Sequence, residues 1–293
     1  MRILAMGDFH GTVPWGLKTF VKRNKVDLVL SPGDFYGDRA HELGPILRKH
    51  RNNIKRNKYG IRNLDGLEKL VSKRKLMKLI KNFSNSGKEV LEYLNEIGLP
   101  VIIVKGNVDN QKSGLTVTSS KYPIEDLVKE FSNIEMLEYE VIEFGEYKIV
   151  GFGAKFPFLC KDNLRGYESD IRNNILNLRR EEKKRLKLLV KDGPERTIIL
   201  SHNPPGNTKL DKINAPSNPW HGRHVGDDIL RSVIEKYQPL LNVCGHMHES
   251  QGKIRVGKTL VVNSGYGKKG EFAVLDLKGK KINVRFYKNF KTK

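Results

Sequence analysis

The chain has 293 residues and a formal charge of +21, because 54 lysines and arginines face only 33 acidic residues. With 38% hydrophobic and 30% charged residues, the composition excludes an intrinsically disordered chain, and no apolar run approaches the ~20 residues that span a bilayer. The basic excess favours anionic partners such as nucleotides or nucleic acid, although a lysine-rich solvated surface gives the same bulk charge.

The N-terminal part of the sequence has the pattern of a strand, a helix and a second strand. Residues 2–6 and 26–30 are apolar runs that stop at Gly7 and at Ser31-Pro32-Gly33. Between them, residues 17–23 favour a helix. This order predicts a βαβ unit with two parallel strands.

A basic segment follows the second predicted strand. Residues 48–88 contain fourteen lysines and arginines but only two acidic residues. Apolar residues at helical spacing predict an amphipathic helix over residues 65–82, a break at 85–87 and a second helix over 89–97. We therefore expect one domain of all 293 residues with a helical basic insertion at about residues 38–98. The outer face of this insertion is either solvated surface or a binding surface for nucleic acid.

The remainder of the chain alternates between apolar strands and short helices. Strands are expected at residues 101–104, 138–144, 147–152, 197–200, 239–243, 260–262, 272–277 and 282–287. Helices are expected at residues 125–131, 172–191 and 227–237. The pattern contains no internal repeat and no linker, and it predicts a single α/β domain.

Five of the apolar runs end in residue types that bind metal ions. The set is Asp8, His10, Asp34, Asn107, His202, His246 and His248. In open α/β sheets, ligands gather beyond the carboxyl ends of the strands. A mixed imidazole and carboxylate set without a thiolate suits Mn, Fe, Zn, Co or Ni. We interpret the five sites as one centre for two divalent metal ions, with Asp34 as the natural bridging ligand.

The order of these motifs resembles that of the calcineurin-like metallophosphoesterase superfamily. The motifs are Asp8-x-His10, Gly33-Asp34, Gly106-Asn107-x-Asp109, His202 and Gly245-His246-x-His248, and they cover nearly the whole chain outside the basic insertion. The resemblance implies a four-layer α-β-β-α sandwich with two facing mixed β-sheets. It also implies one ion held by Asp8, His10, Asp34 and His248, and a second held by Asp34, Asn107, His202 and His246. Within the superfamily, Pro204-Pro205-Gly206 and residues 222–226 are similar to the prokaryotic phosphodiesterase-like branch.

The reaction that this resemblance implies is hydrolysis of a phosphate ester, with phosphodiesters or activated monoesters as the expected substrates. A hydroxide that bridges the metal ions attacks phosphorus in line, and Asn107 binds the phosphoryl oxygens and offsets their charge. Asp109 or Asp38 either accepts a hydrogen bond from a histidine ring or caps a turn.

The chain departs from the superfamily pattern at one position. Many members have a histidine directly after the asparagine of the third motif, whereas this chain has Val108. Valine cannot protonate a leaving group, so the rate is expected to depend steeply on leaving-group acidity unless another group replaces the missing histidine. His224 or His221, from a neighbouring loop, could substitute as the catalytic and substrate-binding histidine, or both could be exposed loop residues without such a role.

Two other functions compete with a phosphoesterase for small substrates. One is a metal-dependent nuclease that uses the basic insertion, and the other is a non-catalytic nucleic-acid-binding or scaffold protein on the same fold. The complete ligand set argues against the second. The two cysteines, Cys160 and Cys244, provide no disulfide framework, and the first motif directly follows the start of the sequence. These features lead us to expect a cytoplasmic protein without a membrane partner.

Overall fold

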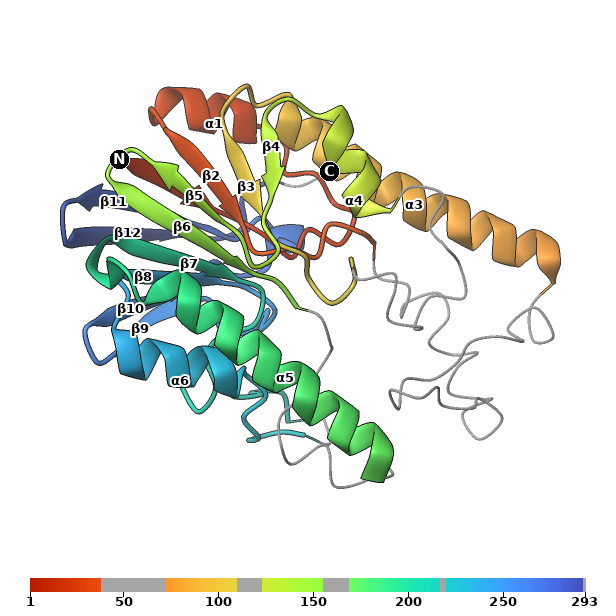
Figure 1. The fold of residues 1–293 in the computed structure, drawn as a ribbon. Coiled ribbons are helices and arrows are strands. Elements are labelled where there is room, and N and C mark those ends of the chain that lie inside the picture. The colour runs from red at the N-terminus through yellow and green to blue at the C-terminus, as the bar shows by residue number, and fades with distance from the viewer. Residues whose placement is uncertain (38–71, 110–122, 155–168, 217–219, 292–293) are drawn as a thin grey trace.

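The computed structural model describes residues 1–37, 72–109, 123–154, 169–216 and 220–291. Within these ranges, two six-stranded β-sheets face each other, and helices cover the outer face of each sheet (Figure 1). The four-layer α-β-β-α sandwich that the sequence predicted is therefore confirmed. None of the helices described is both long and apolar enough to cross a membrane.

The first sheet has the strand order β12-β11-β1-β2-β3-β4. Its parallel strands are β1 (Arg2–Ala5), β2 (Leu28–Ser31), β3 (Val101–Ile103) and β4 (Ile134–Met136). Antiparallel pairs join β1 to β11 (Phe272–Lys278) and β11 to β12 (Lys281–Tyr287).

The second sheet has the strand order β5-β6-β7-β8-β10-β9. Its parallel strands are β6 (Tyr147–Phe152), β7 (Thr197–Ser201), β8 (Leu241–Cys244) and β10 (Thr259–Asn263). The edge strands β5 (Val141–Phe144) and β9 (Gly252–Val256) are antiparallel to their neighbours. Both sheets are therefore mixed, and the parallel strands of each deliver their carboxyl ends to one edge.

The helices divide between the two outer faces. The first sheet is covered by α1 (Leu17–Arg23), α3 (Lys73–Asn95), α4 (Ile124–Leu127) and the short helix η4 (Val128–Glu130). The second is covered by α5 (Ser169–Val190) and α6 (Asp228–Tyr237), which lie side by side (Figure 1). Two further 3₁₀ helices, η6 (Pro194–Arg196) and η7 (Gly267–Lys269), lie in connections.

Strand alternation explains why the central strands are apolar along their whole length. In β1, Ile3 and Ala5 pack between the two sheets, whereas Leu4 packs against the helices that cover the first sheet. The same division places Leu28 and Leu30 of β2 between the sheets and Val29 outside them. Successive strand residues point to opposite faces, and here both faces are buried.

Helix α3 differs from its sequence-based prediction. The predicted break at residues 85–87 is wrong, because one helix runs from Lys73 to Asn95. Gly87 lies inside it, where a Cβ would overlap the ring of Tyr36, so the glycine permits close packing and does not end the helix. Leu91 and Leu94 belong to the core, and this half of α3 is the crossover helix between β2 and β3. Residues 38–71 of the predicted insertion lie outside the described residues.

Two strands have no counterpart in the sequence-based prediction. β4 has three residues, of which the middle one is an exposed glutamate. β9 has five residues, of which three are a glycine and two exposed basic residues. Short edge strands of this kind give a weak alternation signal.

Candidate metal centre

The structure brings the seven predicted ligand residues to one edge of the sandwich. Asp8 and His10 follow β1, Asp34 follows β2 and Asn107 follows β3, all in the first sheet. From the second sheet, His202 follows β7, and the pair His246 and His248 follows β8. The carboxyl ends of the parallel strands of both sheets therefore meet at the same place, as the strand-end rule for α/β folds requires.

Two groups of side chains have the arrangement of metal ligands. Asp8, His10, Asp34 and His248 form one group, in which the ligand atoms all lie within 4.8 Å of one another. Asp34, His202 and His246 form the second group by the same criterion. Asp34 belongs to both groups, which is the position that the sequence assigned to a bridging carboxylate.

The two oxygens of Asp34 have different partners. Oδ2 lies 3.6 Å from Nε2 of His10 and 3.6 Å from Nε2 of His202, one histidine from each group. Oδ1 accepts a hydrogen bond of 2.8 Å from the backbone N–H of Val108. The loop after β3 thus fixes the carboxylate through one oxygen, and the other oxygen faces both groups of ligands.

Ring nitrogens also converge within each group. Nε2 of His10 lies 3.2 Å from Nε2 of His248, and Nε2 of His202 lies 3.0 Å from Nδ1 of His246. The amide Oδ1 of Asn107 lies 2.9 Å from the same Nε2 of His202. A single proton can bridge only one such pair of atoms, whereas a cation accepts several lone pairs at once. The residues therefore fit divalent metal ions, for which this nitrogen and oxygen set is chemically suited.

Burial keeps two of the histidines in the neutral form that ligates a metal. Burial lowers the pKa of His202, and burial together with the charge of His202 lowers the pKa of His246 to about 3. Burial alone would raise the pKa of Asp8, but the hydrogen bond and charge of His248 outweigh it and lower the pKa to about 2. Burial by itself would lower the pKa of His248, but the hydrogen bond to Asp8 and the charge of Asp8 outweigh it and raise the pKa. Nε2 of His248 lies 3.2 Å from Oδ1 of Asp8.

The backbone of the ligand loops is held in an uncommon conformation. Asp8, His10, Asp34 and His246 all have positive φ angles, of 53°, 45°, 60° and 66°. Each residue in this region costs on the order of 1–3 kcal/mol and persists only where surrounding contacts impose it. Part of the constraint comes from close approach, because a Cβ at Gly106 would overlap Asp34, and a Cβ at Gly245 would overlap Asp8. Four strained residues within one ligand set indicate a functional site.

Asp109 organises the ligand loops through backbone contacts. Its buried carboxylate accepts hydrogen bonds from the backbone N–H groups of Asp34 (2.7 Å), Phe35 (2.8 Å) and Gly106 (2.8 Å). Of the two sequence interpretations, the turn-capping role describes these contacts. Nδ1 of His202 lies 2.7 Å from the carbonyl oxygen of Pro32, which selects its Nδ1–H tautomer and leaves Nε2 for a ligand. Asp38 lies outside the described residues.

Sequence reasoning missed Tyr266, an aromatic residue beside the centre. Its ring stacks on that of His248, with centroids 4.0 Å apart and an interplanar angle of 7°, and it meets His10 edge-on at 5.7 Å. The stack supports the orientation of a ligand histidine in a way that polar motif reasoning does not anticipate. The only signal in the sequence is a tyrosine between two glycines, Gly265 and Gly267, just after β10.

His224 lies on the loop that precedes α6. Its Nδ1 lies 2.8 Å from Oδ1 of Asp211, a fully buried carboxylate, and 40% of the His224 side chain is exposed. The next residue, Val225, belongs to an apolar cluster with Met247. In the sequence, Met247 stands between the candidate ligands His246 and His248. Asp211 therefore orients the His224 ring, and sequence reasoning did not identify this partner. His221 on the same loop is exposed.

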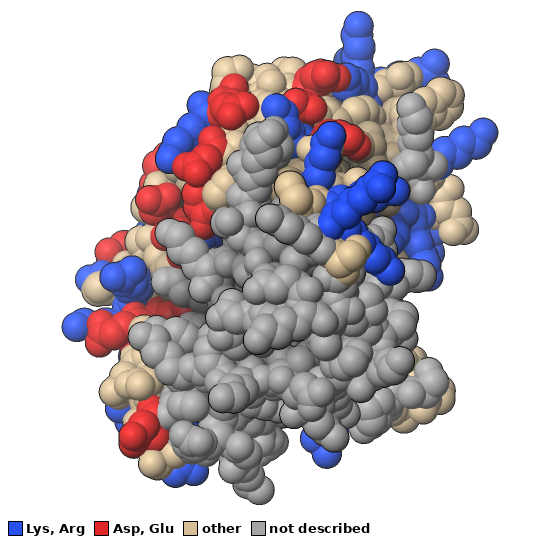
Figure 2. Space-filling model, turned by 90° about the vertical axis from the view of Figure 1, so that its right-hand side faces the viewer, with Lys and Arg blue, Asp and Glu red and all other residues tan. Residues whose placement is uncertain are grey.

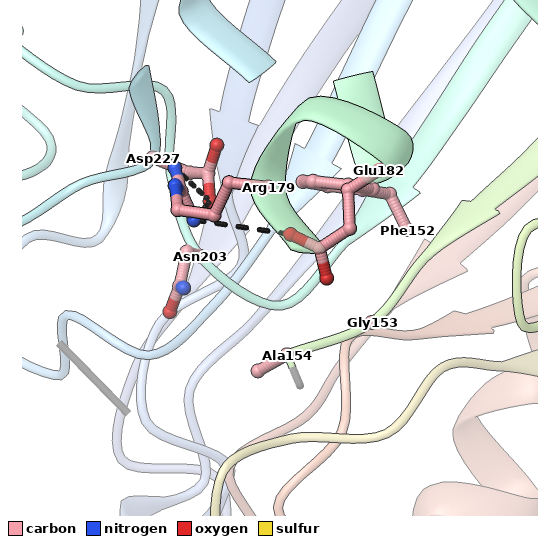
Figure 3. Close-up of a pocket in the computed structure, with 7 residues that line it drawn as sticks. All are labelled: Phe152, Gly153, Ala154, Arg179, Glu182, Asn203 and Asp227. Carbon is pink, nitrogen blue, oxygen red and sulfur yellow. Dashed lines mark hydrogen bonds and ion pairs between the residues drawn. The ribbon is translucent and has the colours of Figure 1, made fainter. Parts of the chain in front are cut away.

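A small pocket adjoins the loop after β7. It is lined by Arg179, Glu182, Asn203 and Asp227 together with residues 152–154 at the end of β6, and its volume is about 10 Å³, the size of one water molecule (Figure 3). Arg179 binds Asp227 at 3.3 Å and lies 4.0 Å from Glu182. With its charge balanced by two carboxylates in so small a space, Arg179 braces α5 against α6 and does not offer a substrate site.

The fold and the ligand groups at its strand ends define a metallophosphoesterase. The family described as metallophosphoesterase, calcineurin superfamily, matches residues 1–286, and the chain belongs to this family. Membership supports a hydrolase that acts on phosphate esters and binds divalent metal ions.

Individual relatives are more distant. The uncharacterized protein MJ1162 of Methanocaldococcus jannaschii is 29% identical over 200 residues, which cover 65% of this chain and 78% of that protein. One solved crystal structure is 20% identical, covers 97% of this chain and 98% of its own, and has a TM-score of 0.60. The protein TT1561 of Thermus thermophilus is 16% identical, with 97% of each chain covered and a TM-score of 0.50. At these identities the solved structures show the shared fold alone.

Proposed function

We propose that the protein is a two-metal phosphoesterase that hydrolyses phosphodiesters or activated phosphomonoesters. The observation that carries this proposal is the pair of ligand groups that share Asp34. Asp8, His10, Asp34 and His248 would hold one ion, and Asp34, Asn107, His202 and His246 would hold the other. Manganese is our first candidate, and Fe, Ni, Co and Zn suit the same ligands. When bound, such ions offset charge on phosphoryl oxygens and lower the pKa of water.

The chain's own residues would orient the substrate and the leaving group. The amide of Asn107 lies beside His202, and its N–H₂ group can donate to a phosphoryl oxygen. Because Val108 cannot donate a proton, we assign protonation of the leaving oxygen to His224. Nδ1 of His224 lies 2.8 Å from Oδ1 of Asp211, which would orient the ring and leave Nε2 as the nitrogen that gives the proton.

The test is metal analysis combined with hydrolysis of bis-p-nitrophenyl phosphate by the purified protein. We expect about two transition-metal ions per chain, and turnover that increases with added manganese. A folded protein that contains no metal, and that shows no hydrolysis with any of the five metals, would refute the proposal. That outcome would favour the non-catalytic scaffold.

A nuclease that uses the basic insertion is the second candidate function. In the described part of that segment, Arg74, Lys75, Lys78 and Lys81 are exposed on α3. Figure 2 shows lysine and arginine side chains gathered over one part of the described surface, apart from a region of acidic side chains. Manganese-dependent cleavage of single- or double-stranded nucleic acid that is lost after charge reversal at Lys73, Arg74 and Lys78, while small esters are still hydrolysed, would support this candidate.

A further inference from the structure

The second sheet carries a basic groove on its helical side. The groove has a volume of about 350 Å³ and lies between α5 and the end of α6. Its lining consists of five cations, one leucine and one tyrosine: Arg180, Lys183, Lys184, Lys187, Lys191, Leu188 and Tyr237. Lys191 precedes β7, whereas His202 follows that strand, so the Lys191 end of the groove lies towards the end of β7 opposite the candidate ligands.

The helix separates a structural face from this basic face. Leu186 and Val190 are fully buried against the sheet, and Glu182 is turned inward towards Arg179, as Figure 3 shows. The five cations recur at helical spacing along the other face, over about 16 Å from Arg180 to Lys191.

Within the part of the chain that the structure describes, the groove cations lack the neighbouring carboxylates that some cations on other helices of the protein have. Lys88 of α3 pairs with Glu92, and Arg231 of α6 pairs with Glu235. Across the residues that the structure describes, none of the five groove cations forms an ion pair with a carboxylate, and no carboxylate lines the groove. Several of them are three or four positions apart, where like charges destabilise a helix. A bound anion with several charges would remove this repulsion.

The shape and apolar lining of the groove favour one kind of polyanion. The side chain of Leu188 is 53% exposed, and Tyr237 is half-buried, with Nζ of Lys236 lying 5.3 Å from the centre of its ring. Proteins bind single-stranded nucleic acid by lining a groove with cations for the phosphates and with apolar or aromatic surface for the bases. An anionic membrane instead needs a face that projects into the lipid, and this surface is concave. We infer that the groove between α5 and α6 binds single-stranded nucleic acid.

The experiment measures binding of a fluorescein-labelled oligothymidylate of about 20 nucleotides, longer than the 4–16 nucleotides that one such site covers. On single strands, each phosphate contact contributes about −0.7 to the slope of log Kobs against log[salt], so five contacts predict a slope of about −3.5. The triple variant Lys184→Glu, Lys187→Glu, Lys191→Glu should flatten the slope by about 2 and weaken binding at low salt. Tyr237→Ser should weaken binding about fivefold or more and leave the slope unchanged.

The matched control reverses three exposed lysines at the turn between β11 and β12, Lys278, Lys280 and Lys281, and changes the net charge by the same amount. This control should keep most of the affinity and slope. The corresponding Lys→Gln groove variant, checked by circular dichroism, separates loss of charge from loss of fold. Wild-type protein that does not bind the oligonucleotide, or equal weakening by groove and control variants, would overturn the inference. So would groove variants that release the protein from phosphatidylserine vesicles and still bind the oligonucleotide normally.

Binding at the groove is independent of the proposed hydrolysis. The groove variants should hydrolyse bis-p-nitrophenyl phosphate at the wild-type rate, since none of the substituted residues belongs to the ligand set. A protein without hydrolytic activity would refute the proposed function and leave the binding result to be judged by itself.

Discussion

Replacement of Gly87 by alanine tests how α3 is joined to the loop that carries Asp34. Gly87 lies within α3, and an added Cβ would overlap the Cγ, Cδ1 and Cε1 atoms of the Tyr36 ring. Tyr36 cannot easily move away, because it is fully buried and stacks on Phe83 with ring centroids 4.8 Å apart. It also lies two residues after Asp34, so its displacement would disturb the ligand loop.

Two effects of opposite sign decide the stability of the Gly87→Ala variant. Alanine is favoured over glycine inside a helix by about 1 kcal/mol. Overpacking a buried site costs about 1–3 kcal/mol, and here the neighbour is a buried ring that stacks on Phe83. We therefore expect the free energy of unfolding to fall by up to about 2 kcal/mol, and the metal affinity to fall with it.

Urea unfolding and metal titration measure these two quantities. The double variant Tyr36→Leu, Gly87→Ala should be less destabilised than the sum of its single variants, because leucine leaves room for the new methyl group. An exposed helix substitution, Asn174→Ala in α5, serves as the control and should raise stability slightly. If Gly87→Ala also raised stability, Gly87 would be an ordinary helix glycine, and the packing argument would be wrong.

Other predictions concern the candidate centre. Asp34→Ala should abolish turnover and lower metal content without unfolding the protein, as elemental analysis and circular dichroism will show; normal metal content would contradict a shared ligand. Asp109→Asn should lower the free energy of unfolding by about 1–3 kcal/mol, because the amide cannot accept all the backbone hydrogen bonds that the carboxylate accepts. The measurement is made at pH 8, because burial and the charge of Asp34 raise the pKa of Asp109 to about 7. Loss of turnover at unchanged stability would instead support a direct catalytic role. His224→Ala should slow hydrolysis of aryl phosphodiesters with poor leaving groups by about 10²- to 10⁴-fold and nitrophenyl esters much less; the same slope against leaving-group pKa in both proteins would exclude His224 as the acid. Metal affinity should decrease as the pH falls through the raised pKa of His248, because the protonated ring cannot ligate; titration calorimetry across this range checks the direction, and a pH-independent affinity would remove His248 from the ligand set.

The sequence determined the class of fold and which residues meet at the candidate centre. Apolar runs such as residues 2–6 and 26–30 are buried strands because both their faces are covered, and the polar residues that follow them project from the sheet edge. This relation between strand and following residue is local, so it can be read without coordinates. The spacing of two residues in Asp8-x-His10 and His246-x-His248 is also local, and it placed both pairs correctly at strand ends.

Only the tertiary structure decided which residues support that set. Asp211 is thirteen positions from His224, Asp109 is 75 positions from Asp34, and Tyr266 reaches His10 across more than two hundred residues. Gly87 was interpreted as a helix break because the sequence does not reveal that Tyr36 packs against it. Such contacts depend on how the two sheets and their outer helices come together in space, and no local pattern of residues carries that information.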